Sequence, residues 1–273
     1  MRELDRLDRE QGLGALPGGA PPRRSWRRRT ASPALAGVAV TAVLLSGVVL
    51  VGPGDEMATV RRLFGLGSDR FGSPPEFTPG EGEFKFLVTQ RGSDAPVGYD
   101  PCRPVEYAVN PAGGPPDWEE LVDTAVAHTE WATGLELRDV GPTEGRPFNP
   151  MRSGPFGGTD DPVIIGFADS EEIGGLSGDV AGLGGSVATR DTLGRDYFVT
   201  GSIALDTDVF EDASDGPERS NLQAIVDHEF GHVVGLDHVD DPAELMYESN
   251  VGVTDYGPGD LEGMARLGSI PCK

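Results

Sequence analysis

Apolar and polar positions follow two different periods over the C-terminal two thirds of the chain. Short apolar or alternating runs predict strands at 104–109, 135–140, 162–168, 183–188 and 201–205. Apolar positions three or four residues apart predict helices from 117 to about 134, from Ser220 through the histidine-rich segment, and from 258. Structured sequence begins near 84–88. Strands and helices are therefore mixed, with most of a sheet preceding the second helix, which predicts an α+β domain.

A separate apolar run, residues 34–51, precedes this domain and contains no charged side chain. Its length is just sufficient for a helix to cross a bilayer. Arginines before it and acidic residues after it orient the amino terminus toward the cytoplasm. The alternative is a cleaved signal peptide, which leaves a secreted protein. The long polar segment that precedes the run and the lack of a clear A-x-A site favour the anchor.

These segments predict four parts of the chain. Residues 1–33 form a basic, disordered cytoplasmic tail, 34–51 a transmembrane signal anchor, 52–82 a flexible extracellular stalk rich in Gly and Pro, and 83–273 a folded domain. The protein is thus expected at the cell membrane as a single-pass protein with its folded domain extracellular.

Charge excludes one class of partner. The formal net charge is −23, and because residues 1–51 hold eight arginines and four acidic residues, the rest of the chain carries the whole acidic excess. A chain of this charge has no electrostatic footprint for nucleic acid. The acidic residues leave Ca²⁺ binding possible, although no stretch matches an EF-hand loop.

The chemistry lies in the stretch HEFGHVVGLDH, residues 228–238, which contains three of the four histidines of the chain. On a helix, His228 and His232 project from one face because they are four residues apart. Gly235 can end the helix and turn the chain, so that His238 returns as a third nitrogen ligand. Three imidazoles and one open position are typical of a catalytic zinc site, and Glu229 is placed to act as a base.

This stretch and the residues after it resemble the metzincin metallopeptidases. The pattern HExxHxxGxxH is followed eight residues later by Met246, the place of the Met-turn in that clan. The segments NLQAIVDHEFGHVVGLDH, ELMY and TDYGPGDLEGMARLG are similar to the matrixin type, and an anchor followed by a bare catalytic domain resembles the bacterial type. The resemblance implies a zincin-like domain with a twisted five-stranded mixed sheet, two main helices and a short C-terminal helix.

The resemblance also implies residue roles. One zinc ion is held by His228, His232 and His238, and Met246 supports the site by packing. A peptide binds antiparallel to the edge strand 183–188, for which Leu183, Gly184, Gly185 and Tyr247 are the expected substrate-binding residues.

Three departures from the matrixin pattern stand out. Val239 follows the third histidine where matrixins place Ser, and Glu248 stands where they often have Pro. The histidines of the second, structural zinc of animal matrixins are absent, which implies that only one zinc is bound.

Cys102 and Cys272 are the only cysteines. In an exported domain two thiols tend to oxidise, which predicts a Cys102–Cys272 disulfide. The alternative, a Cys102 thiolate that blocks the metal in a latent form, lacks the surrounding sequence pattern of such switches.

The expected function is that of a zinc-dependent endopeptidase acting on proteins or peptides outside the cell. The alternative is a non-catalytic, zinc-containing surface protein that binds partners with the same fold. The intact Glu229 favours the enzyme.

Overall fold

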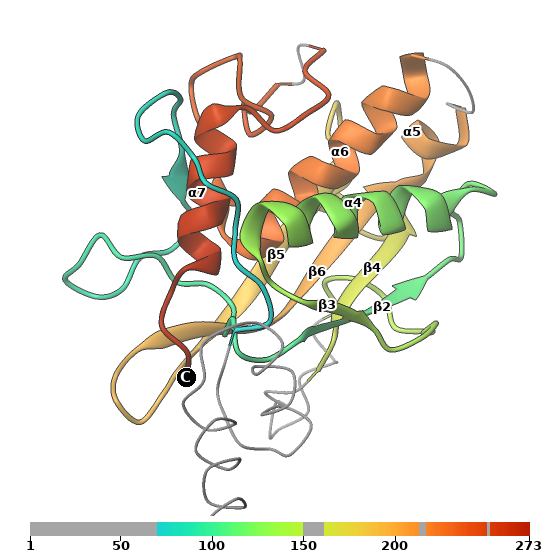
Figure 1. The fold of residues 1–273 in the computed structure, drawn as a ribbon. Coiled ribbons are helices and arrows are strands. Elements are labelled where there is room, and N and C mark those ends of the chain that lie inside the picture. Colours follow the sequence, from blue (N-terminus) through green and yellow to red (C-terminus); the bar gives the residue numbers. More distant parts are fainter. Residues whose placement is uncertain (1–69, 150–160, 213–216, 250–251) are drawn as a thin grey trace, which may run out of the picture. The chain divides into compact units, whose positions relative to one another are not determined.

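A five-stranded sheet forms the centre of the fold (Figure 1). The computed structural model describes residues 70–149, 161–212, 217–249 and 252–273. The strands, in spatial order, are β3 (Leu137–Asp139), β2 (Val105–Asn110), β4 (Val163–Ala168), β6 (Asp196–Asp206) and β5 (Gly182–Arg190). Strand β5 is antiparallel to β6, and the other neighbouring pairs are parallel. The predicted mixed sheet is confirmed.

Helices and a small second sheet complete the described part of the chain. They are β1 (Lys85–Phe86), α4 (Trp118–Thr133), the short 3₁₀ helix η2 (Gly174–Leu176), α5 (Thr207–Asp212), α6 (Pro217–Val234), β7 (Leu236–Asp237) and α7 (Pro258–Gly268). The two main helices, α4 and α6, pack against each other, and α6 also contacts β5 and β6 (Figure 1). Strands β1 and β7 pair antiparallel. The two main helices and the short C-terminal helix match the predicted α+β fold.

The core lies between the sheet and these helices. Strand β4 is buried along its whole length, as its continuous apolar run predicts. Its Ile165 and Phe167 belong to the same apolar cluster as Leu121 of α4, Phe230 of α6 and Met264 of α7. The α6 face opposite His228 and His232 is therefore fixed by packing, which gives these two side chains a rigid support.

The start of α6 differs from the prediction. The helix begins at Pro217 and not at Ser220, consistent with the preference of proline for the first helical turn. Asp117 directly precedes α4, and its side chain makes no capping hydrogen bond. Its carboxylate instead forms an ion pair with Arg219 of α6, which ties the two main helices together near their starts.

The described part of the predicted stalk, residues 70–82, packs along α7. Arg70 donates to the carbonyls of Gly268, Ser269 and Ile270 at 2.5, 2.8 and 2.6 Å, where α7 ends. The Gly80 N–H donates to Glu262 of the same helix at 2.7 Å. The packed domain therefore includes residues 70–82. The segment is held by contacts with residues far away in the sequence, which composition does not reveal.

The structure contradicts the prediction of a membrane-anchored protein. Across the described ranges, no helix combines the length and the apolar character that a membrane span requires. The longest, α6, has 18 residues but carries Arg219, Asp227 and Glu229. The predicted anchor, 34–51, lies outside the described residues. The predicted span and the localisation based on it are withdrawn.

Cys102 and Cys272 form a disulfide between residues whose Cα atoms are 5.6 Å apart. The bond joins the segment before β2 to the end of the chain after α7. Because 170 residues separate the two cysteines, it closes almost the whole described domain into one loop.

Candidate metal centre and catalytic cleft

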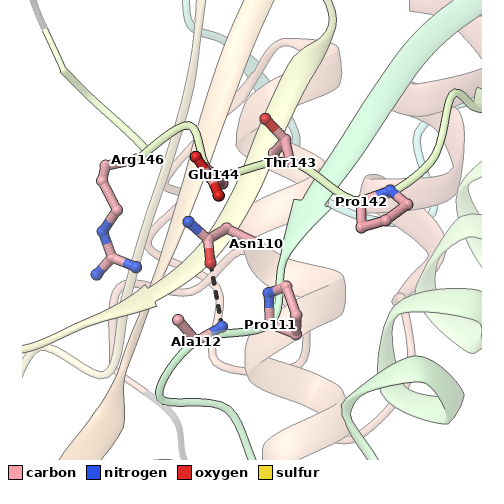
Figure 2. Close-up of a pocket in the computed structure, with 7 residues that line it drawn as sticks. All are labelled: Asn110, Pro111, Ala112, Pro142, Thr143, Glu144 and Arg146. Carbon is pink, nitrogen blue, oxygen red and sulfur yellow. Dashed lines mark hydrogen bonds between the residues drawn. The ribbon is translucent and has the colours of Figure 1, made fainter.

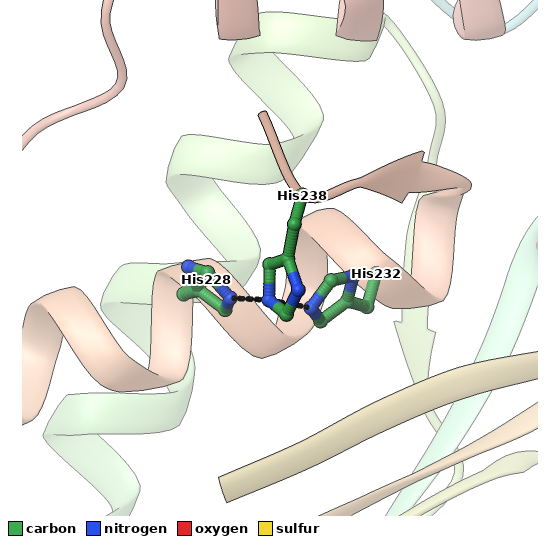
Figure 3. A group of neighbouring side chains, drawn as sticks. All are labelled: His228, His232 and His238. Atoms are coloured by element: carbon green, nitrogen blue, oxygen red, sulfur yellow. Dashed lines mark hydrogen bonds between the residues drawn. The ribbon is translucent and has the colours of Figure 1, made fainter. Parts of the chain in front are cut away.

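Helix α6 and the chain that turns back after it bring three imidazoles together (Figure 3). His228 and His232 lie one turn apart on α6. Gly235 follows the helix with φ of +125°, a conformation that favours glycine, and the chain turns there into β7. His238 comes directly after β7 and points back at the other two rings. The turn predicted at Gly235 is therefore the element that completes the cluster.

The hydrogen bonds of the imidazoles define which nitrogens are available as ligands. His228 Nδ1 donates to the Leu245 carbonyl and His232 Nδ1 to the Leu236 carbonyl, both at 2.8 Å. A carbonyl oxygen can only accept, so the proton of each neutral ring is on Nδ1 and Nε2 carries a lone pair. Backbone carbonyls that fix the tautomer in this way are common behind metal-binding histidines.

The Nε2 atoms of the three rings converge. His238 Nε2 lies 3.1 Å from Nε2 of both His228 and His232. His238 can donate a proton to one of these atoms at most, so at least one pair of lone pairs is left facing each other. Burial lowers the pKa of His228 to about 3, with a further contribution from His232, and burial also lowers the pKa of His232. Neutral, converging nitrogen donors fit a cation such as Zn²⁺.

Glu229 lies beside this cluster with an unusual environment. Only 5% of the residue is exposed, and its Oε2 has no hydrogen-bond partner within the described chain. Burial raises the pKa of this carboxyl group to about 8. A buried polar atom without a partner is costly and calls for an explanation, which a ligand or substrate in the cleft can provide.

Met246 packs against α6 and is 1% exposed. A Cβ added to Gly231, which lies between the two helical histidines, would meet Met246 Sδ at 2.5 Å. The Val239 N–H donates to the Met246 carbonyl at 3.1 Å and so holds this segment against the turn that carries His238. The Met246 thioether therefore lies against Gly231 of α6, and it does not belong to the group formed by His228, His232 and His238.

The histidines and Glu229 line a cleft of about 670 Å³. Of the expected substrate-binding residues, Leu183, Gly184 and Tyr247 line it and Gly185 does not. Glu248, one of the departures noted above, also lies on the wall. Strand β5 is the outer strand of the sheet, so one edge of its backbone pairs with no other strand in the part of the chain that the structure describes.

Several residues that shape the site gave little signal in the sequence. Gly182, Gly231, Glu244 and Asp260 make close or buried contacts around it. Only Gly231 was detectable in advance: a glycine inside a helix costs about 1 kcal/mol relative to alanine, which indicates a close approach by another group.

A second cavity, of about 690 Å³, opens beside the ends of β2 and β3 (Figure 2). Two of its polar side chains, Asn110 and Arg146, are paired within the protein. The Asn110 side chain donates to the Gly145 carbonyl at 3.0 Å and accepts from the Ala112 N–H at 3.1 Å. Arg146 forms an ion pair with Glu172. With these groups already paired, the cavity carries no argument for a ligand.

Comparison with known proteins agrees with the chemistry of the cleft. Residues 157–259 match the Matrixin family model. The matched segment contains all three histidines, Glu229 and Met246. The match supports a metzincin-type zinc metallopeptidase, and His228, His232 and His238 form a group that could hold a metal ion. No match to a curated protein is found.

Two solved structures share a distant likeness with the chain. Archaemetzincin from Methanopyrus kandleri is 15% identical over 59% of this chain and 93% of that chain, with a TM-score of 0.39. The GM1-bound form of the ECX AB5 holotoxin is 12% identical over 60% of this chain and 79% of that chain, with a TM-score of 0.33. At this level of similarity neither structure bears on the activity of the chain.

Proposed function

We propose that the protein is a zinc-dependent endopeptidase that hydrolyses peptide bonds of proteins or peptides. His228, His232 and His238 would hold one zinc ion through their Nε2 atoms, and Met246 would support them from below. The observation that carries the proposal is that three imidazole Nε2 atoms converge beside a buried carboxyl group whose Oε2 has no hydrogen-bond partner among the described residues. When bound, zinc supplies a positive charge that acidifies a nearby water molecule and polarises a carbonyl oxygen.

Residues of the chain itself would carry out the other steps of the reaction. Glu229 accepts a proton from the attacking water and passes it to the leaving amine. Burial raises the pKa of this carboxyl group, which makes its ionised form a stronger base, and a cation held by the neighbouring histidines would favour that ionised form. The unpaired edge of β5 offers backbone hydrogen bonds to a substrate in extended conformation. The outcome is cleavage of a peptide bond positioned between β5 and the histidine cluster.

The decisive experiment compares the full-length protein with Glu229→Gln on a denatured protein substrate. We expect cleavage by the wild type, loss of cleavage on treatment with a chelator, and recovery when zinc is added back. Glu229→Gln should bind zinc normally and lose at least about 100-fold in kcat. The exposed Glu171→Gln is the matched control and should retain full activity.

Two outcomes would contradict the proposal. Equal rates of cleavage by the wild type and Glu229→Gln would show that Glu229 is not the catalytic base. A folded wild type that binds zinc but cleaves nothing would favour the non-catalytic binding protein. Metal analysis of the folded protein should find about one zinc per chain.

A further inference from the structure

Strand β5 crosses α6 directly over Glu229. A Cβ added to Gly182 would lie 2.8 Å from both Cγ and Oε1 of Glu229 and 3.0 Å from its Cδ. A Cβ added to Gly184 would lie 2.3 Å from the Glu229 carbonyl oxygen and 3.0 Å from Oε2. Carbon atoms do not approach these groups so closely without strain, so a side chain at either position would force a movement.

Backbone conformation does not explain why these residues are glycines. Neither Gly182 nor Gly184 has a φ in the left-handed region, so any residue can adopt their backbone angles. Glycine weakens a strand interior, and its presence there often marks a close approach by another group. Gly185, in the same strand, has no atom within 4 Å of an added Cβ. The close approach is therefore specific to the two glycines that face Glu229.

Polar contacts do not fix the Glu229 carboxylate either. Its Oε2 has no hydrogen-bond partner in the described residues, and the residue is almost fully buried. A catalytic base is normally oriented by a hydrogen bond from a neighbouring group. The main chains of Gly182 and Gly184 lie close against Glu229.

We propose that Gly182 and Gly184 are positioning residues for the Glu229 carboxylate. Their bare backbone forms a wall that holds the side chain in place by packing alone. The two positions act on different parts of Glu229. An alanine at 182 meets the side chain and displaces the carboxylate, whereas an alanine at 184 meets the main-chain carbonyl and displaces the strand. The inference rests on the proposed function in so far as it concerns catalysis.

The kinetic test uses the full-length, zinc-loaded protein. Gly182→Ala should lower kcat by roughly 10- to 100-fold, because a shift of about 1 Å in a reacting group costs that much. KM and zinc content should stay within about twofold of the wild type, since the strand and the histidines are not displaced. Gly174→Ala, whose added Cβ meets nothing within 4 Å and which lies outside the cleft, should leave kcat unchanged. An unchanged kcat in Gly182→Ala would overturn the proposal.

A second test needs no activity and uses the metal-free full-length protein. Gly182→Ala should lower the melting temperature by roughly 2–10 °C, the usual range for an overpacked contact in a domain of this size. In a Glu229→Ala background, Gly182→Ala should leave the melting temperature unchanged, because the three atoms nearest the added Cβ all belong to the Glu229 side chain. Gly185→Ala serves as the stability control and should have the same small effect in both backgrounds.

The two tests separate the proposals. If the wild type cleaves nothing, the proposed function fails and the melting-temperature cycle still decides whether the glycines hold Glu229. If Gly182→Ala lowers the melting temperature equally in the wild-type and Glu229→Ala backgrounds, the positioning role is overturned, even in an active enzyme.

Discussion

Asp260 offers a sharp test of how α7 supports the metal centre. The residue is fully buried in the first turn of α7. Its carboxylate accepts hydrogen bonds from the Leu245 N–H at 2.6 Å, the Gly257 N–H at 3.0 Å and the Met246 N–H at 3.4 Å. It therefore links the helix to the segment that carries the packing methionine and the carbonyl that holds His228.

Two opposing effects act on the proton of Asp260. Burial, reinforced by the nearby charge of Glu244, favours the neutral acid, whereas the three backbone donors favour the carboxylate. Burial is the larger effect and raises the pKa of Asp260 to about 7. The folded state thus holds this proton more tightly than the unfolded chain, in which the group has its ordinary pKa of 3.8.

The free energy of unfolding should therefore fall as pH rises from about 4 to about 7 and level off on both sides. A difference of roughly 3 pH units corresponds to about 4 kcal/mol lost across this window. Asp260→Asn cannot titrate. At pH 5 the variant should be about 1–2 kcal/mol less stable than the wild type, because its amide group replaces one acceptor oxygen. By pH 7.5 this deficit should have disappeared or reversed.

The assay is urea unfolding of the metal-free protein at several pH values from 4.5 to 8. Removing the metal avoids the protons that ligand binding releases, and the difference between variant and wild type cancels the titration of distant groups. The exposed Asp123→Asn controls for the loss of one surface charge. Parallel curves for Asp260→Asn and wild type across the whole range would refute the reasoning, because they would show that the carboxylate stays ionised.

Three further predictions concern the disulfide, the N-terminal segment and the third ligand. Replacing Cys102 and Cys272 with Ser should lower the free energy of unfolding by up to about 5 kcal/mol, because the disulfide closes a very long loop. Urea unfolding measures the change, and an unchanged urea midpoint would contradict the prediction. Arg70→Ala should lower stability by about 1–3 kcal/mol in the same assay, because three carbonyls at the end of α7 lose a charged donor. His238→Ala should lower zinc affinity at least about 10-fold in chelator competition, and equal affinity would remove it from the ligand set.

Local periodicity was sufficient to predict much of the fold. The apolar run at 162–168 became the fully buried β4, and the helical period from 258 became α7. The histidine cluster was predictable for the same reason. Spacing of four residues on a helix and a glycine turn fix where His228, His232 and His238 point, whatever surrounds them.

Contacts between distant segments were decided only by the tertiary structure. The composition of residues 70–82 predicted a stalk, yet the segment packs along α7 through Arg70 and Gly80. The approach of Gly182 to Glu229 joins residues 47 positions apart, and neither sequence neighbourhood indicates it. The spacing of apolar residues along a helix or strand shows which of its faces is apolar. Which other element covers that face depends on the packing of the whole chain, and here that packing sets the surroundings of the carboxylate proposed as the catalytic base.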